Sequence, residues 1–189
     1  MKIVKVEDEN LLEKIYRLRY EVLCEEIKTL DRSQYPDGLE KDRYDSHADQ
    51  YAILTEEGEL IGCFRLIYRC PIGFPTLNVM DMNDLLERID GEKLCEISRI
   101  TVDRRYRSFR TVMKIFRLIM RDGCPFMKRE GMEYLLCAVE ENLYRLLRMA
   151  GVPFRKIGEA KEYLQRYRYP TLLSMEELAR KHPEFCDFR

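Results

Sequence analysis

The sequence predicts one mixed α/β domain, residues 1–189, built around a central sheet. Segments with strand character alternate with segments of helical periodicity along the whole chain. Apolar residues make up 46% and charged residues 35% of the 189 residues, which is a globular composition. The length is enough for one domain with its own core. The sequence contains no repeats, low-complexity tracts or linkers.

The N-terminal part predicts a strand, a helix and a long polar loop. Residues 2–6 are predicted as a strand, and residues 9–28 as a helix because apolar side chains recur on one helical face. At about 100° per residue, Arg19 lies on that apolar face, where a guanidinium needs a partner or a path to water. Residues 31–49 form a polar loop around the turn Pro36-Asp37-Gly38. A loop of this length is usually functional or disordered.

The middle of the chain predicts mainly strands. Glu56-Glu57-Gly58 separates two strand-like runs and is a hairpin signal. Prolines and a glycine favour an irregular segment after the hairpin. In order, the expected elements are strands at 50–55 and 59–69, an irregular segment at 70–83, a short helix at 83–89 and the clearest strand at 94–102.

The C-terminal half predicts alternating helices and strands. Gly151 closes one helix, and the capping box Ser174-x-x-Glu177 opens the last one. The expected elements are a helix at about 107–122, a strand at 133–139, a helix at 141–149, strands at 152–157 and 161–168, and a C-terminal helix. The last strand would place four polar or aromatic side chains on one face, as sheet packing or as a pocket wall: Tyr163, Gln165, Tyr167 and Tyr169.

The charge and the cysteines indicate the compartment and exclude several classes of partner. A net charge of −1 argues against a nucleic-acid binder. Seven cysteines without a C-x-x-C pair argue against a disulfide framework and a thiolate zinc site, and indicate a reducing compartment. Charged residues such as Lys2, Lys5 and Glu7 interrupt any signal peptide, and no apolar stretch reaches the roughly 18–20 residues of a membrane span. We expect a cytoplasmic protein without stable membrane insertion.

The strand at 94–102 carries two charged side chains, Glu96 and Arg99, that could take part in catalysis. Residues three apart in a regular strand point to opposite faces, which would separate the two side chains. A β-bulge between them would bring both to one side and free a backbone N–H, which could stabilise an oxyanion. A salt bridge at the end of the strand is the alternative interpretation.

The polar loop carries three carboxylates within six residues: Glu40, Asp42 and Asp45. They could bind a divalent cation, although the spacing is not that of an EF-hand, or form a solvated charge run. Charge balance favours a third interpretation, pairing with Arg19, Arg65 or Arg99, because buried arginines need carboxylates. No metal is therefore expected. His47 in the same loop is more often a structural hydrogen-bonding residue than a proton-transfer group.

The helix at about 107–122 carries a basic stripe. Its members are Arg107, Arg110, Lys114, Arg117 and Arg121. Cations of one sign on one helix face repel one another unless an anion approaches. A phosphate or an acidic protein partner would fit this stripe, and a solvated face is the alternative.

Four charged motifs follow one another in the first part of the chain: Arg19, Glu40-x-Asp42-x-x-Asp45, Gly62-x-x-Arg65 and Glu96-x-Ser98-Arg99. Together they resemble the acyl-homoserine-lactone (autoinducer) synthases over roughly residues 15–105. The longer strings at 16–22 and 38–47 look closer still to the PEP-CTERM/exosortase-associated acyltransferases and the N-acyl amino acid synthases. The resemblance implies a GNAT-like fold with the bulge on its central strand.

The resemblance also implies substrates and residue roles. The donor would be an acyl thioester on the phosphopantetheine of acyl carrier protein, the acceptor a small amine such as an amino acid or S-adenosylmethionine, and no cofactor would stay bound. The expected catalytic residues are Glu96, Ser98 and Arg99, with Glu96 as general base. The expected substrate-binding residues are Arg19, Glu40, Asp42, Asp45 and Arg65. The expected residues for the carrier or its phosphopantetheine are Arg104, Arg105, Arg107, Arg110 and Lys114.

Two departures from the related families refine this expectation. The chain has no Trp, and Leu23 and Cys95 stand where autoinducer synthases carry aromatic residues. The loss of these aromatics moves the expectation from lactone formation toward long-chain N-acyl transfer. CoA-dependent enzymes of this fold use a glycine-containing loop, whereas residues 104–108 contain no glycine, which favours a carrier-bound donor. The alternatives are an autoinducer synthase, a non-catalytic acyl- or carrier-binding module and a CoA-dependent acetyltransferase.

Overall fold

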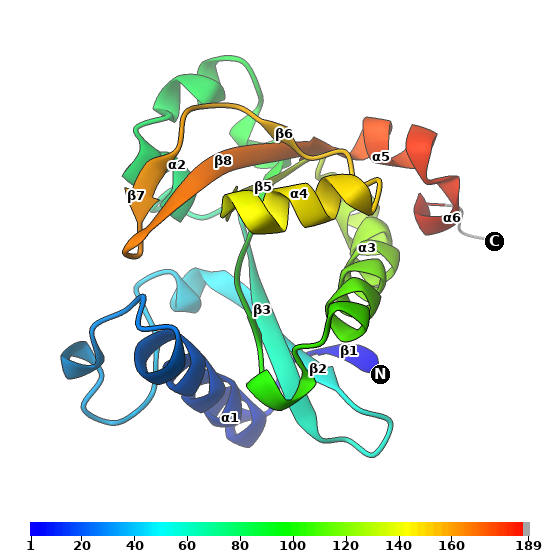
Figure 1. Cartoon of the computed structure of the whole chain (residues 1–189). Coiled ribbons are helices and arrows are strands. Elements are labelled where there is room, and N and C mark those ends of the chain that lie inside the picture. Colours follow the sequence, from blue (N-terminus) through cyan, green and yellow to red (C-terminus); the bar gives the residue numbers. More distant parts are fainter. Residues whose placement is uncertain (187–189) are drawn as a thin grey trace.

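The computed structural model describes residues 1–186, except for the side chain of Asn83. Its strands form one sheet in the order β1-β2-β3-β4-β5-β8-β6, with β7 paired to β8 (Figure 1). Strands β4 and β5 run parallel, and the other paired strands are antiparallel. The strands are β1 (Lys2–Lys5), β2 (Ala48–Leu54), β3 (Leu60–Tyr68), β4 (Leu94–Val102), β5 (Tyr134–Val139), β6 (Arg155–Lys156), β7 (Lys161–Tyr163) and β8 (Arg166–Ser174).

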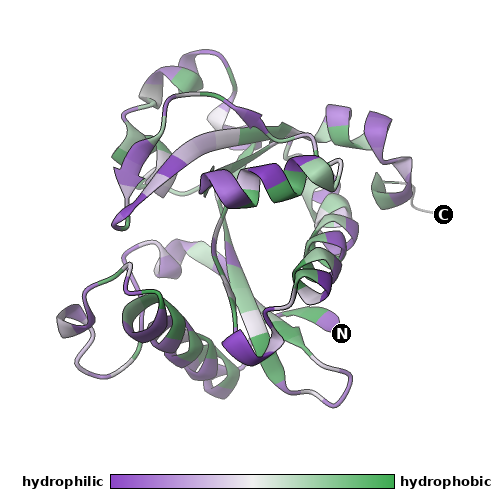
Figure 2. Ribbon diagram, viewed as in Figure 1, coloured by the Kyte–Doolittle hydropathy of each residue, from purple (hydrophilic) through white to green (hydrophobic). Residues whose placement is uncertain are grey.

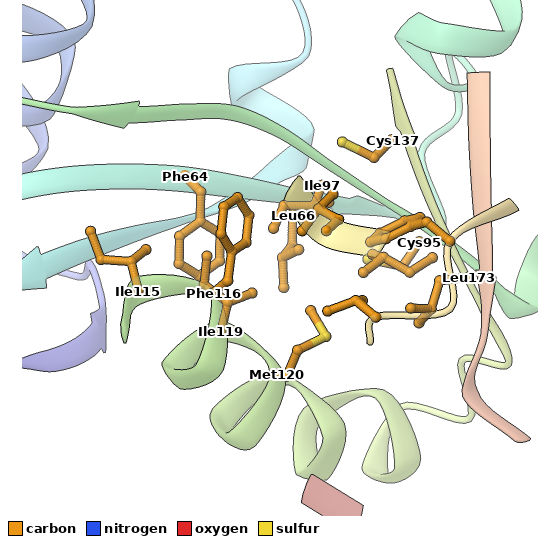
Figure 3. Packing of buried hydrophobic residues seen from close by; sticks show 14 of the residues in the cluster. Phe64, Leu66, Cys95, Ile97, Ile115, Phe116, Ile119, Met120, Cys137 and Leu173 are labelled. Atoms are coloured by element: carbon orange, nitrogen blue, oxygen red, sulfur yellow. The ribbon is translucent and has the colours of Figure 1, made fainter. Parts of the chain in front are cut away.

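Helices cover both faces of the sheet. They are α1 (Glu9–Tyr20), α2 (Pro75–Met80), α3 (Phe109–Arg129), α4 (Glu141–Met149), α5 (Met175–Lys181) and α6 (Pro183–Cys186). The alternation along β3 sends Cys63 toward α1 and Phe64 toward α3. Figure 3 shows Phe64, Leu66 and Ile97 packed against the apolar side of α3. Figure 2 shows β3 as hydrophobic along most of its length, as expected for a strand covered on both faces.

The helix predicted at 9–28 changes its winding halfway. The α-helix ends at Tyr20, and a π-helical turn continues over Glu21–Glu26. Within it, the N–H of Ile27 donates to the carbonyl of Val22, five residues earlier, at 2.8 Å. The wider turn shifts the helical face, which a pattern with a period of 3.6 residues does not reveal.

Two further helices differ from the prediction. Helix α2 lies in the segment expected to be irregular, and begins with Pro75 at its first position, where a missing N–H costs nothing. Its six residues are too few to show a period. Helix α3 continues past the predicted end at residue 122 and through Pro125 to Arg129. Phe126 and Met127 after this proline are buried, so tertiary packing stabilises a helix that local propensity would end.

The prediction of a single strand at 161–168 is wrong. It is a hairpin of β7 and β8, joined by Leu164 and Gln165 with φ of 53° and 54°. Two consecutive positive φ values are typical of a type I′ turn, which usually contains Asn or Gly. Because this turn contains neither, the residue types did not predict the hairpin. Consequently Tyr163 and Tyr167 lie on different strands, and the proposed common face of residues 163, 165, 167 and 169 does not exist.

Other predicted elements are confirmed with small changes. The strand at 94–102 and the helix at 141–149 have the predicted bounds. The short helix at 83–89 is a 3-10 helix over Asn83–Glu87, and the strand at 152–157 shortens to β6. In the part of the chain that the structure describes, no helix combines the length and apolar character needed to cross a bilayer.

Candidate active site

Strand β4 contains the bulge that the sequence permitted. The register of β3 against β4 shifts by one residue beside Arg65. Arg99 within the bulge has φ of 54°, a left-handed conformation that is uncommon for a side chain other than glycine. The extra residue turns Arg99 onto the face that carries Ser98 and Glu96. The predicted bulged central strand is therefore confirmed.

A cleft opens where β4 and β5 separate. Their pairing extends as far as Glu96, which lies opposite Leu136. Beyond this pair lies a cavity of about 350 Å³, open to solvent on one side. Its walls come from the π-helical turn, β4, β5, the start of α4 and the β7–β8 hairpin. In Figure 1, α1 and β1 to β3 form the lower half of the molecule, and α2 and the β7–β8 hairpin form the upper half.

Glu96 lies at the inner end of this cleft and is 1% exposed. Its Oε2 accepts from the N–H of Thr76 at 3.1 Å, and its Oε1 accepts from the Thr76 hydroxyl at 2.8 Å. Burial raises the pKa of Glu96 to about 7, against the opposing effect of these hydrogen bonds. A carboxyl group with this pKa can accept or release a proton near neutral pH.

Three arginines and three carboxylates form a closed ring, which we call the charge ring. Each arginine donates to two carboxylates, and each carboxylate accepts from two arginines. In order around the ring, its members are Arg19, Glu40, Arg99, Asp42, Arg65 and Asp45. The pairing of the acidic loop with arginines, one of three interpretations of the sequence, is therefore what the structure contains.

The charge ring is strongly held. Arg19 bonds both oxygens of Asp45 at 2.8 and 3.0 Å, and Arg65 bonds both oxygens of Asp42 at 2.6 and 3.0 Å. Burial opposes the ionisation of Asp45, but Arg19 and Arg65 hold its pKa well below the usual value. Burial likewise disfavours the charge on Arg19, but Glu40 and Asp45 raise its pKa. Arg19 and Asp45 are therefore charged at neutral pH, and the ring contains as many arginines as carboxylates.

The predicted site residues divide into two groups. Glu96, Ser98 and Arg99 line the cleft. The other five members of the charge ring do not line the cleft and lie behind the strand β4 wall. One of them, Arg65, donates to the hydroxyl of Ser98 at 2.9 Å. Within residues 1–186, no group of His, Cys, Asp and Glu side chains is arranged to hold a metal ion. His47 lies exposed in a 3-10 turn outside the lining of the cleft.

The predicted carrier-binding residues lie on and before the first turns of α3. Arg105 is paired with Asp103 and Glu59. Arg107 is paired with Glu26 and donates to a backbone carbonyl. The remaining three are exposed: Arg104, Arg110 and Lys114.

Two residues of the site, Thr76 and Arg168, were missed from the sequence, whereas Tyr163 had been considered as a pocket wall. Thr76, the partner of Glu96, lies on α2, and Pro75 was the only local signal for that helix. Tyr163 and Arg168 reach the cleft through the β7–β8 hairpin. No sequence signal pointed to Arg168, because the position of its strand depends on a turn without glycine.

The chain matches the family described as N-acyl amino acid synthase FeeM over residues 14–175. It is 25% identical to an acyl-homoserine-lactone synthase of Aeromonas hydrophila over 151 residues, which cover 76% of this chain and 70% of that protein. The resemblance inferred from the charged motifs is therefore confirmed.

Two solved structures share the fold. The acyl-homoserine-lactone synthase LasI superimposes with a TM-score of 0.71 at 17% identity, covering 96% of this chain and 93% of that one. FeeM, an N-acyl amino acid synthase from uncultured soil microbes, gives a TM-score of 0.67 at 16% identity, covering 95% and 93%. The predicted GNAT-like fold is confirmed. The chain belongs to the N-acyl amino acid synthase FeeM family and is an acyltransferase.

Proposed function

We propose that this protein transfers a long-chain acyl group from the thioester of acyl carrier protein to the amine of an amino acid or a related small molecule. The position of Glu96 is the observation that carries the proposal. It is a buried carboxyl group with a pKa of about 7, and it lies beside a bulge where two strands separate. Such a group can deprotonate an amine near neutral pH.

The proposed reaction uses this geometry. Glu96, directly or through one water, takes a proton from the amine, and the nitrogen lone pair attacks the thioester carbonyl carbon. A backbone N–H of the bulged strand stabilises the oxyanion of the tetrahedral intermediate. The C–S bond then breaks, the amide forms, and the phosphopantetheine sulfur leaves with a proton. The charge ring holds Arg99 and, through Arg65, Ser98 in the wall of the cleft, which supports their role in orienting the substrates.

An apolar cavity of about 50 Å³ on the α3 side of the sheet supports an acyl substrate, and at this volume it holds only the first part of a long chain unless its walls move. Its walls are almost entirely apolar and include Phe64, Leu66 and Met120. Ile97 of β4 lines both this cavity and the cleft. Methionine and leucine side chains can move to admit an alkyl chain. We assign this cavity to the acyl chain of the donor.

The exposed basic surface of α3 supports a carrier-bound donor. Acyl carrier proteins are acidic, and cations on one helix face attract such a partner at long range. Exchanging Arg110 and Lys114 for Glu is expected to weaken carrier binding by about 10- to 100-fold at low salt, with less effect at high salt. Titration calorimetry or surface plasmon resonance at two salt concentrations measures this. The matched control is Arg148→Glu on α4. Unchanged affinity after the exchange of Arg110 and Lys114 would show that the basic stripe of α3 is only a solvated surface.

The proposed function is tested by direct transfer. The protein is incubated with long-chain acyl carrier protein and a panel of acceptors that includes amino acids and S-adenosylmethionine. We expect an N-acyl amino acid, detected by mass spectrometry, together with an equal amount of free carrier thiol. If neither product appears with any acceptor, the proposal fails.

An autoinducer synthase is the second candidate. The relative from Aeromonas hydrophila is an acyl-homoserine-lactone synthase, and the charged motifs of this chain resemble those of both groups. An N-acyl homoserine lactone formed from S-adenosylmethionine in the same panel would decide for it. The absence of Trp and of the aromatics at positions 23 and 95 favours an amino acid acceptor instead.

A further inference from the structure

Arg168 is a cation in the cleft that the mechanism above does not use. It lies on β8, lines the cleft, and has a side chain that is 14% exposed. Its guanidinium donates to the backbone carbonyl of Tyr163 and, at 3.3 Å, to the carboxylate of Glu140. The side chain of Glu140 is 43% exposed, so much of its charge is screened by water.

The other cleft cation, Arg99, differs sharply from Arg168. Arg99 donates to Glu40, which is fully buried, and to Asp42, whose side chain is 25% exposed. Burial disfavours the charge on Arg99, but these carboxylates raise its pKa above the usual value. Burial lowers the pKa of Arg168, Glu140 compensates only in part, and the charge of Arg99 lowers the pKa further. Arg168 is therefore a mostly buried cation without a matching buried anion, which is unfavourable unless a ligand supplies the anion.

Tyr163 places Arg168 next to the reacting groups. The centre of the Tyr163 ring lies 5.8 Å from the Cζ atom of Arg168. Burial raises the pKa of Tyr163, and the charges of Arg99 and Glu96 act on it in opposite directions, so this side chain lies near both groups. One aromatic side chain thus lies against both cleft arginines and near the proposed base.

We propose that Arg168 binds the α-carboxylate of the acceptor, while Glu96 takes the proton from its α-amine. This inference rests on the proposed acyl transfer to an amine. A guanidinium binds a carboxylate through two parallel hydrogen bonds, which fixes the orientation as well as the position of the acceptor. The subsite selects acceptors that carry a carboxylate beside the amine over simple alkyl or aryl amines. Glu140 is the internal carboxylate that the substrate replaces.

The test compares an amino acid with the amine formed by its decarboxylation. Wild-type protein should use the amino acid about 30- to 100-fold more efficiently, measured as kcat/KM. Arg168→Gln should raise KM for the amino acid by this factor, change kcat by less than about threefold, and use both acceptors alike. Arg168→Lys should restore part of the preference, because it keeps the charge without the planar fork. Arg148→Gln on α4 is the exposed control and should behave like wild type.

A second variant keeps the inference testable if Arg168→Gln does not fold in a thermal melt. Glu140→Gln removes the internal carboxylate, and should lower KM for the amino acid about three- to tenfold while leaving the simple amine unchanged. An unaltered preference in both variants would overturn the inference, even if wild-type protein makes N-acyl amino acids. Failure of wild-type protein to acylate any amine would overturn the proposed function instead.

Discussion

Glu96→Gln is expected to lower kcat by about 10²- to 10⁴-fold without changing the affinity for acyl carrier protein. An amide has the shape of the carboxyl group and keeps a contact with Thr76, but it cannot accept the amine proton. Single-turnover transfer measures the chemical step, and calorimetry measures carrier binding. A variant that turns over normally would remove Glu96 from the mechanism. Carrier binding without turnover in wild-type protein would indicate a non-catalytic binding module.

The pH dependence gives an independent measurement of the same group. Because the pKa of Glu96 is about 7, kcat should rise about tenfold per pH unit below neutral pH and level off above it. The residual activity of Glu96→Gln should lack this inflection. An inflection that persists in the variant would belong to another group.

The free energy of unfolding shows whether the Glu96→Gln variant is folded. The folded protein binds the Glu96 proton more tightly than the unfolded chain, with a pKa of about 7 against 4.5. Stability is therefore lost as the pH rises through this window. Glu96→Gln lacks this loss, so above pH 7 its free energy of unfolding should exceed that of wild type by up to about 3 kcal/mol. Below pH 4.5 the two proteins should be similar.

Asp45→Asn is expected to lower the free energy of unfolding by about 3–5 kcal/mol. The substitution keeps the volume but leaves Arg19 and Arg65, both fully buried, with one charged partner each instead of two. Urea-induced unfolding at neutral pH measures this loss. Asp37→Asn is the matched control in the same loop, because that side chain is half exposed and lies 3.8 Å from the amine of Lys41. A loss below 1 kcal/mol would show that the charge ring does not stabilise the fold.

The sequence predicted most of the sheet and the chemistry of the charge ring, but not its connections. Arg19 on an apolar face required a carboxylate, and three were available. Arg19 binds Glu40 and Asp45, which are 21 and 26 positions away in the sequence, and Arg99 binds Glu40, which is 59 positions away. Local patterns contain no information about such pairings.

The missed parts of the site have a common physical cause. Thr76 lies on a helix of six residues, and Arg168 on a strand that follows a turn without Asn or Gly. Both elements owe their positions to packing rather than to local preference. Periodicity and turn chemistry therefore predicted the scaffold better than the walls of the cleft.

The closed form of the charge ring has a consequence for how its losses combine. Every member has two links, so any single neutral substitution breaks two of the six. Two neighbours such as Arg19 and Glu40 share a link, and removing both breaks three, whereas Arg19 and Asp42 lie opposite each other and removing both breaks four. Coupling free energies should therefore follow the order of residues around the ring, not their order along the chain.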